Sequence, residues 1–221
     1  MTANVGKGKY AGNLSVIRGG AIRSARAILP MMLELIPPPE TAVDVGGGEG
    51  WWGAYLAEHC GTEVVCLDGE IVEGTPIPVI ETDLEQPGSV GGPYDLGICV
   101  EVAEHLTPER GPSFIAELCQ AAPAWVFSAA IPGQTGIVHV NCRWQSYWAD
   151  EFKRNGFKVT QAAWRVWRNT FVEAWYRQNL LFAWEPEIHE ISLPEVVMDV
   201  VHPDIWRWQK KKLRIWDFLD G

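Results

Sequence analysis

The residues best suited to binding chemistry are glycines that alternate after an acidic residue. They are Asp44, Gly46, Gly48 and Gly50. An apolar run before them and a helix-like run after them predict a buried strand, a tight turn and a helix start. Glycine lets the backbone turn sharply or approach a ligand closely, and a helix N-terminus presents N–H groups to an anion. Taken alone, such a pattern is more often a glycine-rich loop that binds nothing.

Acidic residues also follow three later strand-like segments. They occur in Asp68-Gly69 after Glu63–Leu67, Asp83-Leu84 after Pro78–Glu81, and Glu101-Val102 after Tyr94–Val100. An acid that ends the second strand of a βαβ unit lies where a nucleotide ribose would bind, so Asp68 could accept both ribose hydroxyls. Asp83 could accept a hydrogen bond from an adenine amino group, with Leu84 against the ring. Each acid taken alone is more often a turn or cap residue.

Strand and helix patterns alternate along the chain, which predicts an α/β fold with a mainly parallel sheet and helices on both faces. Pro30 is expected to split an N-terminal helical pattern into two short helices, and Gly111-Pro112 to interrupt a helix that starts at Thr107-Pro108. The other expected elements are strands at Thr41–Val45, Ala124–Ile131, Phe157–Trp164 and Leu180–Trp184, and helices at Trp51–Cys60, Arg143–Asn155 and Asn169–Gln178. The carboxyl ends of the strands would gather the acids at one ligand-binding edge.

The composition limits the function classes. The net charge of −10 over 221 residues argues against a nucleic-acid partner, which would need a basic surface. Five scattered cysteines resemble reduced thiols, and the lack of a signal-like or bilayer-length apolar run favours a cytoplasmic protein without a membrane partner. Met1–Asn13 is expected to be ordered only by a ligand or partner, and Lys210–Lys212 to be a solvated face. The oligomeric state is not readable from the sequence.

Four segments in this order resemble the class I methyltransferases that use S-adenosylmethionine. They are Asp44–Gly50, Asp68, Asp83-Leu84 and Glu101–Leu106, within a region of similarity from about Ala42 to Trp184. The resemblance implies a Rossmann-like, seven-stranded, mostly parallel sheet whose last strand is antiparallel beside the fifth. It also implies three segments: an N-terminal helical extension (1–40), the S-adenosylmethionine-binding domain (41–184) and a C-terminal extension packed on it (185–221).

The resemblance assigns roles to the motif residues. Glycines of the first motif would contact the methionine and ribose of the cofactor, Asp44 would orient its amino end, and Glu101 would line the approach of the methyl group. The cofactor-binding residues implied are Asp44, Gly46, Gly48, Gly50, Asp68, Gly69, Asp83, Leu84, Glu101 and Val102.

Two other classes compete with this interpretation. The run Gly48–Gly53 also matches the dinucleotide fingerprint of an NAD-dependent oxidoreductase, with Asp68 near the expected ribose acid. That motif gives no role to Asp44, Asp83 or Glu101. A non-catalytic binding module on the same fold would be expected to have lost the acids and glycines that are intact here.

The segment from His139 to Trp148 is the predicted acceptor side. Its aromatic and polar residues suit a sugar or other hydroxylated small molecule, and this part resembles bacterial and phage methyltransferases of that kind. The expected acceptor contacts are His139, Asn141, Arg143, Trp144 and Tyr147. An oxygen acceptor needs a base, for which His139 is favoured over His105; with Glu101, these are the candidate catalytic residues.

A metal-assisted variant is also possible. Glu101, Glu104 and His105, with a later histidine, resemble the magnesium cluster of the small-RNA terminal 2′-O-methyltransferases. The sequence pattern Glu-x-x-Glu-His is also common in proteins that bind no metal there, and the negative net charge of the chain disfavours RNA as a substrate. The sequence therefore favours a site without metal.

Overall fold

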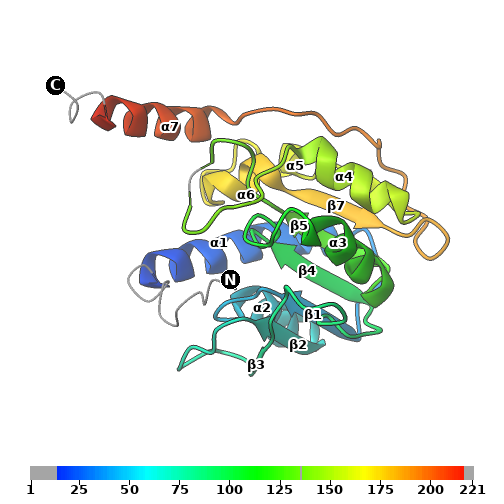
Figure 1. Cartoon of the computed structure of the whole chain (residues 1–221). Helices are drawn as coiled ribbons and strands as arrows, with labels where there is room; N and C mark the ends of the chain where they lie inside the picture. Colours follow the sequence, from blue (N-terminus) through cyan, green and yellow to red (C-terminus); the bar gives the residue numbers. More distant parts are fainter. Residues whose placement is uncertain (1–13, 135, 217–221) are drawn as a thin grey trace.

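The computed structural model describes residues 14–134 and 136–216 (Figure 1). The strands are β1 Thr41–Val45, β2 Glu63–Asp68, β3 Val79–Glu81, β4 Leu96–Val100, β5 Ala124–Ser128, β6 Lys158–Thr160 and β7 Leu181–Trp184. The helices are α1 Leu14–Leu33, α2 Trp51–Cys60, α3 Arg110–Ala121, α4 Gln145–Arg154, α5 Ala163–Val166, α6 Ala174–Asn179 and α7 Pro203–Trp216. The prediction for Met1–Asn13 lies outside the described residues, as do the side chains of Lys210–Lys212.

The seven strands form one sheet in the order β3-β2-β1-β4-β5-β7-β6. Strands β1 to β5 pair in parallel, whereas β7 runs antiparallel between β5 and β6. The predicted α/β fold, with its antiparallel last strand beside the fifth, is confirmed. Because β1, β2 and β4 are in parallel register, their carboxyl ends meet at one edge of the sheet.

Helices cover both faces of this sheet. On one face, α3 and α4 bury Phe114, Leu118 and Phe152 against alternate residues of the strands. On the other face, α1, α2, α5 and α6 pack against the opposite set, with Leu29 and Leu56 fully buried. The period-2 alternation of side chains along a strand supplies an apolar surface to each face.

The predicted break at Pro30 is wrong, since α1 continues through it to Leu33. Pro30 comes near the end of the helix, where only one further turn follows. Ile28, Leu29 and Met32 are buried around it, and their packing outweighs the backbone hydrogen bond that proline removes.

The predicted interruption at Gly111-Pro112 is also wrong. Both residues lie in the first turn of α3, which begins at Arg110. A proline is tolerated there because N–H groups of the first turn have no partner within the helix.

The second half of the chain differs most from its prediction. The expected strand Phe157–Trp164 is shortened to β6 and followed by α5, and the helix expected over Arg143–Asn155 begins at Gln145, after Trp144. The structure adds α7, which the sequence interpretation left irregular and which lies beside α6 at one end of the molecule (Figure 1). All five cysteines are unpaired, and no described helix is long and apolar enough to cross a membrane.

Candidate active site

The glycine loop between β1 and α2 is held open at its centre. Gly46, Gly48 and Gly50 all have positive φ angles, which disfavour residues with a Cβ. A Cβ on Gly46 would lie 2.4 Å from Val102 Cγ2, whereas one on Gly48 would have no heavy atom of the described residues within 4 Å. Gly46 therefore allows the loop after β4 to pack closely, and Gly48 borders open space that a ligand could fill.

Asp44 lies under this loop and is 1% exposed. Its Oδ2 accepts a hydrogen bond from the Gly53 N–H at 2.8 Å, which joins β1 to the first turn of α2. Its Oδ1 is buried and has no hydrogen-bond partner among the described residues. Burial raises the pKa of Asp44 to about 7.

Asp68 closes the other side of the loop. Its Oδ2 accepts from the Gly48 N–H at 2.8 Å and its Oδ1 from the Glu70 N–H at 2.9 Å. Burial is the main reason that its pKa is raised. A carboxylate has about four acceptor sites, so Asp68 could still accept ribose hydroxyls. Gly69 follows it at the same edge.

Asp83 and Leu84 lie further along this edge. Asp83 is exposed and accepts from the Glu85 N–H at 3.1 Å and from Gln86 Nε2 at 3.1 Å, the turn role that such acids usually have. Leu84 is buried in the core beside α3. Neither contact tests the predicted adenine pocket, which stays a prediction.

Glu101 has a strained backbone directly after β4. Its φ of 57° is unusual for a residue with a side chain, and such outliers concentrate at functional sites. Its carboxylate accepts from Gln134 Nε2 at 2.8 Å and from Asn179 Nδ2 at 2.9 Å. Burial raises its pKa, while these amides favour the charged form. Nothing local in the sequence marks Gln134 or Asn179 as its partners.

Glu104, His105 and His139 come together next to Glu101. One possible ligand atom from each lies within 4.8 Å of the others, and the two imidazole rings meet edge to face with centroids 4.9 Å apart. Burial lowers the pKa of both histidines, so both are neutral near pH 7. Burial, followed by the charge of Glu101, raises the pKa of Glu104 well above its ordinary value. The structure therefore brings together both predicted bases.

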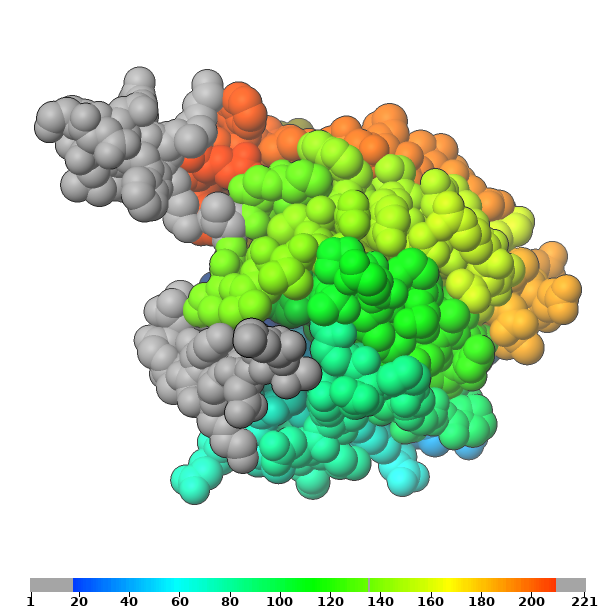
Figure 2. All heavy atoms as spheres, in the orientation of Figure 1, coloured from blue at the N-terminus to red at the C-terminus, as the bar shows by residue number. Residues whose placement is uncertain are grey.

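The predicted acceptor contacts divide into two groups. Asn141 is buried, and its Nδ2 donates to the Ala103 carbonyl while its Oδ1 accepts from Arg143 Nε at 2.9 Å. Arg143 and Trp144 are exposed, and the Arg143 guanidinium lies 5.1 Å from the Tyr147 ring centroid. Figure 2 shows the segment after β5, in light green, on the surface of this face. Arg143 and Trp144 are thus accessible, Tyr147 and His139 are half-buried, and Asn141 supports the loop from inside.

The sequence interpretation missed the partners of Glu49 in the glycine loop. The buried Glu49 carboxylate accepts from Arg18 Nε at 2.8 Å and from Trp51 Nε1 at 2.7 Å. The hydrogen bond from Arg18 is the main reason that the pKa of Glu49 is lowered. Trp52 packs in the core with its ring against Tyr176. Arg18 comes from α1, so this helix fixes the loop.

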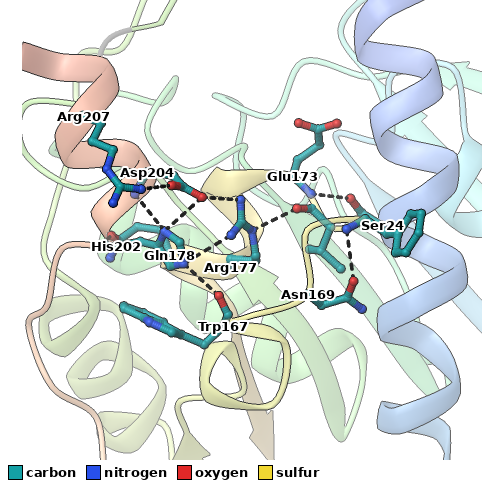
Figure 3. Close-up of polar contacts among 11 residues, drawn as sticks. Ser24, Trp167, Asn169, Glu173, Arg177, Gln178, His202, Asp204 and Arg207 are labelled. Atoms are coloured by element: carbon teal, nitrogen blue, oxygen red, sulfur yellow. Dashed lines mark hydrogen bonds and ion pairs between the residues drawn. The ribbon is translucent and has the colours of Figure 1, made fainter. Parts of the chain in front are cut away.

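The C-terminal segment fixes α6 (Figure 3). Arg177 pairs with Asp204 at 2.9 Å, and the Gln178 Oε1 accepts from the His202 N–H. His202 Nε2 lies 2.8 Å from the Trp167 carbonyl, to which it donates. These contacts stabilise the helix whose last residue, Asn179, donates to Glu101.

Solved structures with a similar fold include methyltransferases named for a didemethyltoxoflavin, a porphyrin and a sugar. A 1,6-didemethyltoxoflavin-N1-methyltransferase from Burkholderia thailandensis has 16% identity and a TM-score of 0.54, over 80% of this chain and 83% of that one. Magnesium protoporphyrin IX methyltransferase from Synechocystis PCC 6803, with bound SAM, has 20% identity and a TM-score of 0.54, over 81% and 86%. A sugar N-methyltransferase from Streptoalloteichus sp. has 13% identity and a TM-score of 0.56, over 77% and 91%.

At these identities the likeness is one of fold. The chain has the Rossmann-like methyltransferase fold, with its candidate site at the carboxyl edge of the sheet. No family model matches the sequence, and no curated protein matches it significantly.

Proposed function

We propose that the protein is an S-adenosylmethionine-dependent methyltransferase that methylates a small-molecule or sugar acceptor on oxygen. The observation that carries this proposal is the space over Gly48, which the described residues leave open beside Asp68. Asp44, with its unpartnered Oδ1, lies buried under the same loop. The fold neighbours support it, because they include methyltransferases crystallised with S-adenosylmethionine or S-adenosylhomocysteine.

The residues of this edge fit the cofactor. Loop backbone beside Gly48 would border its methionine and ribose, and Asp68 would accept ribose hydroxyls. Asp44 has one buried oxygen that lacks a hydrogen-bond donor, which an ammonium group would supply. Asp83 and Leu84 remain the proposed adenine-side contacts. The cofactor would supply a methyl group on a positively charged sulfur, which is a good leaving group because it departs as a neutral thioether.

The protein then has to align the acceptor with that methyl group, and alignment alone can contribute several kcal/mol to the rate. A hydroxyl acceptor must also lose its proton. His105 and His139 are neutral and lie past Glu101 at the same edge, so they are placed to activate the acceptor oxygen. Arg143, Trp144 and Tyr147 would contact a polar ring on the accessible side.

Calorimetry with S-adenosylmethionine and with NAD tests the cofactor assignment. We expect S-adenosylmethionine to bind and NAD not to bind, and the reverse result would refute the proposal. Asp68→Ala should weaken cofactor binding at least tenfold, a loss of about 1.4 kcal/mol, whereas His139→Ala should leave it nearly unchanged. A screen of hydroxylated and amine acceptors with methyl-labelled cofactor then identifies the receiving atom. Transfer to amines alone would contradict the choice of oxygen.

A further inference from the structure

We propose that Glu104, His105 and His139 form a binding site for one divalent transition-metal ion. This assignment replaces the sequence prediction of a site without metal. It depends on the geometry of three side chains that two separate segments contribute, the turn after β4 and the loop after β5.

The first observation is the state of Glu104. Its side chain is fully buried, yet neither carboxyl oxygen has a hydrogen-bond partner among the described residues. A buried carboxyl group without a partner is costly, and coordination of a cation is one way in which proteins compensate such a group. The same carboxyl group has an oxygen within 4.8 Å of nitrogen atoms of both imidazoles.

The second observation is the orientation of His139. Its Nδ1 lies 3.0 Å from the Gln134 carbonyl oxygen, which can only accept a hydrogen bond. Nδ1 therefore carries the proton of the neutral ring, and Nε2 carries the lone pair. Metal-binding histidines typically donate their other ring nitrogen to a carbonyl or carboxylate in this way. The Val138 carbonyl likewise lies 3.3 Å from Nδ1 of His105 and orients that ring.

The ligand set indicates the kind of metal. Two imidazoles and one carboxylate suit first-row ions such as Mn²⁺, Fe²⁺, Co²⁺ and Zn²⁺, while Mg²⁺ and Ca²⁺ prefer sites made of oxygen ligands. Three protein ligands leave coordination positions for other molecules.

Glu101 does not belong to this group, although it is the first acid of the same Glu-x-x-Glu-His run. The ligand atoms that lie within 4.8 Å of one another come from Glu104, His105 and His139, and not from Glu101. The two carboxyl oxygens of Glu101 are instead oriented by hydrogen bonds from Gln134 and Asn179. The structure thus separates a cation ligand, Glu104, from an acid that amides hold in place.

With a cation bound, His105 and His139 would be its ligands and no longer the base. The cation would bind the acceptor oxygen and lower its pKa, and the proton would pass to solvent water before methyl transfer. This use of the metal rests on the proposed function. The binding of the metal does not.

Cobalt titration of the full-length, metal-free protein tests the site. We expect one Co²⁺ per chain, with visible absorption bands from nitrogen and oxygen ligands, and calorimetry should give at least hundredfold weaker binding of Mg²⁺ than of Zn²⁺. Glu104→Gln and His139→Ala should each weaken Co²⁺ binding at least tenfold. Glu101→Gln is the matched control and should retain the wild-type affinity for Co²⁺.

Two results would overturn the site. One is the absence of stoichiometric Co²⁺ or Zn²⁺ binding, and the other is wild-type affinity for Co²⁺ in both Glu104→Gln and His139→Ala. Equal affinity for Mg²⁺ and Zn²⁺ would refute the choice of metal. If Glu104→Gln fails to fold by circular dichroism, His139→Ala decides, because His139 is half-buried. Calorimetry with S-adenosylmethionine on the same metal-free protein separates the proposals. If the protein binds S-adenosylmethionine but neither Co²⁺ nor Zn²⁺, only the metal site is refuted. If it binds the metal but not S-adenosylmethionine, only the proposed function is refuted.

Discussion

Gly48→Ala provides a sharp test of where the cofactor lies, because a control of the same geometry exists. Gly48 has a φ of 58° and Gly61, which caps the C-terminus of α2, has a φ of 71°. A Cβ at either position would meet no heavy atom of residues 14–134 and 136–216 within 4 Å. Both substitutions therefore impose similar backbone strain and no clash with that part of the chain.

The strain of a left-handed alanine is about 1–2 kcal/mol, so each variant should lose about that much free energy of unfolding. The N–H that Gly48 donates to Asp68 is retained in the alanine variant. Only the new methyl group at position 48 enters the proposed cofactor space. We expect Gly48→Ala to weaken S-adenosylmethionine binding at least tenfold, about 1.4 kcal/mol, and Gly61→Ala to leave it unchanged.

Urea unfolding gives the stability of both variants, and calorimetry at a temperature where both are folded gives their affinities. Wild-type affinity in Gly48→Ala would refute the placement of the cofactor over this loop. An equal loss in Gly61→Ala would mean that affinity follows stability and not contact.

Two further predictions concern buried polar groups. The pKa of Asp44, raised to about 7 from 3.8, means that the folded state binds this proton more tightly than the unfolded state does. The stability that it contributes is present below pH 3.8 and is lost as the pH rises to about 7. Asp44→Asn should therefore show a smaller fall in the free energy of unfolding than wild type between pH 4 and pH 7, and parallel curves would contradict the raised pKa. Gln178→Leu leaves the His202 N–H without its buried acceptor, while the Val200 carbonyl keeps its hydrogen bond from Gln145, so urea unfolding should show a loss of about 1–3 kcal/mol. Ser146→Ala removes an exposed hydrogen bond to Asp199 in the same segment and should cost less than about 1 kcal/mol; equal losses would argue against the role of Gln178.

The part of the fold that contains the glycine loop could be predicted from local sequence patterns. Strand β1 and helix α2 have the predicted bounds because apolar runs, the glycine cluster and the cap at Gly61 act within a few residues. The glycine positions, Asp68 and the meeting of His105 with His139 follow from the parallel sheet, which gathers strand ends at one edge.

The rest depends on contacts between distant residues, which no local pattern encodes. Asn179 donates to Glu101 across 78 positions, and Gln145 donates to Val200 across 55. Pro30 was misjudged because its effect depends on the packing around it, which only the tertiary structure supplies. Helix α7 follows an extended segment that is held by hydrogen bonds to α4 and α6, so its sequence alone gave no reason to expect it.

Glu101 and Glu104 show how the environment assigns different chemistry to two identical side chains. They are three residues apart, and either could be a ligand, a base or a structural acid by residue type alone. Asn179, at the end of α6, donates to Glu101 and to Gln134 Oε1, and Gln134, from the loop after β5, also donates to Glu101. Neither of these side-chain amides donates to Glu104, which has two imidazoles beside it. Because the amides come from elements on either side of the site, a displacement of α6 would release Glu101 and allow the two acids to compete for the same partners. The hydrogen bonds from the C-terminal segment to α6 therefore affect the chemistry of the site through Asn179, although none of their residues touches it.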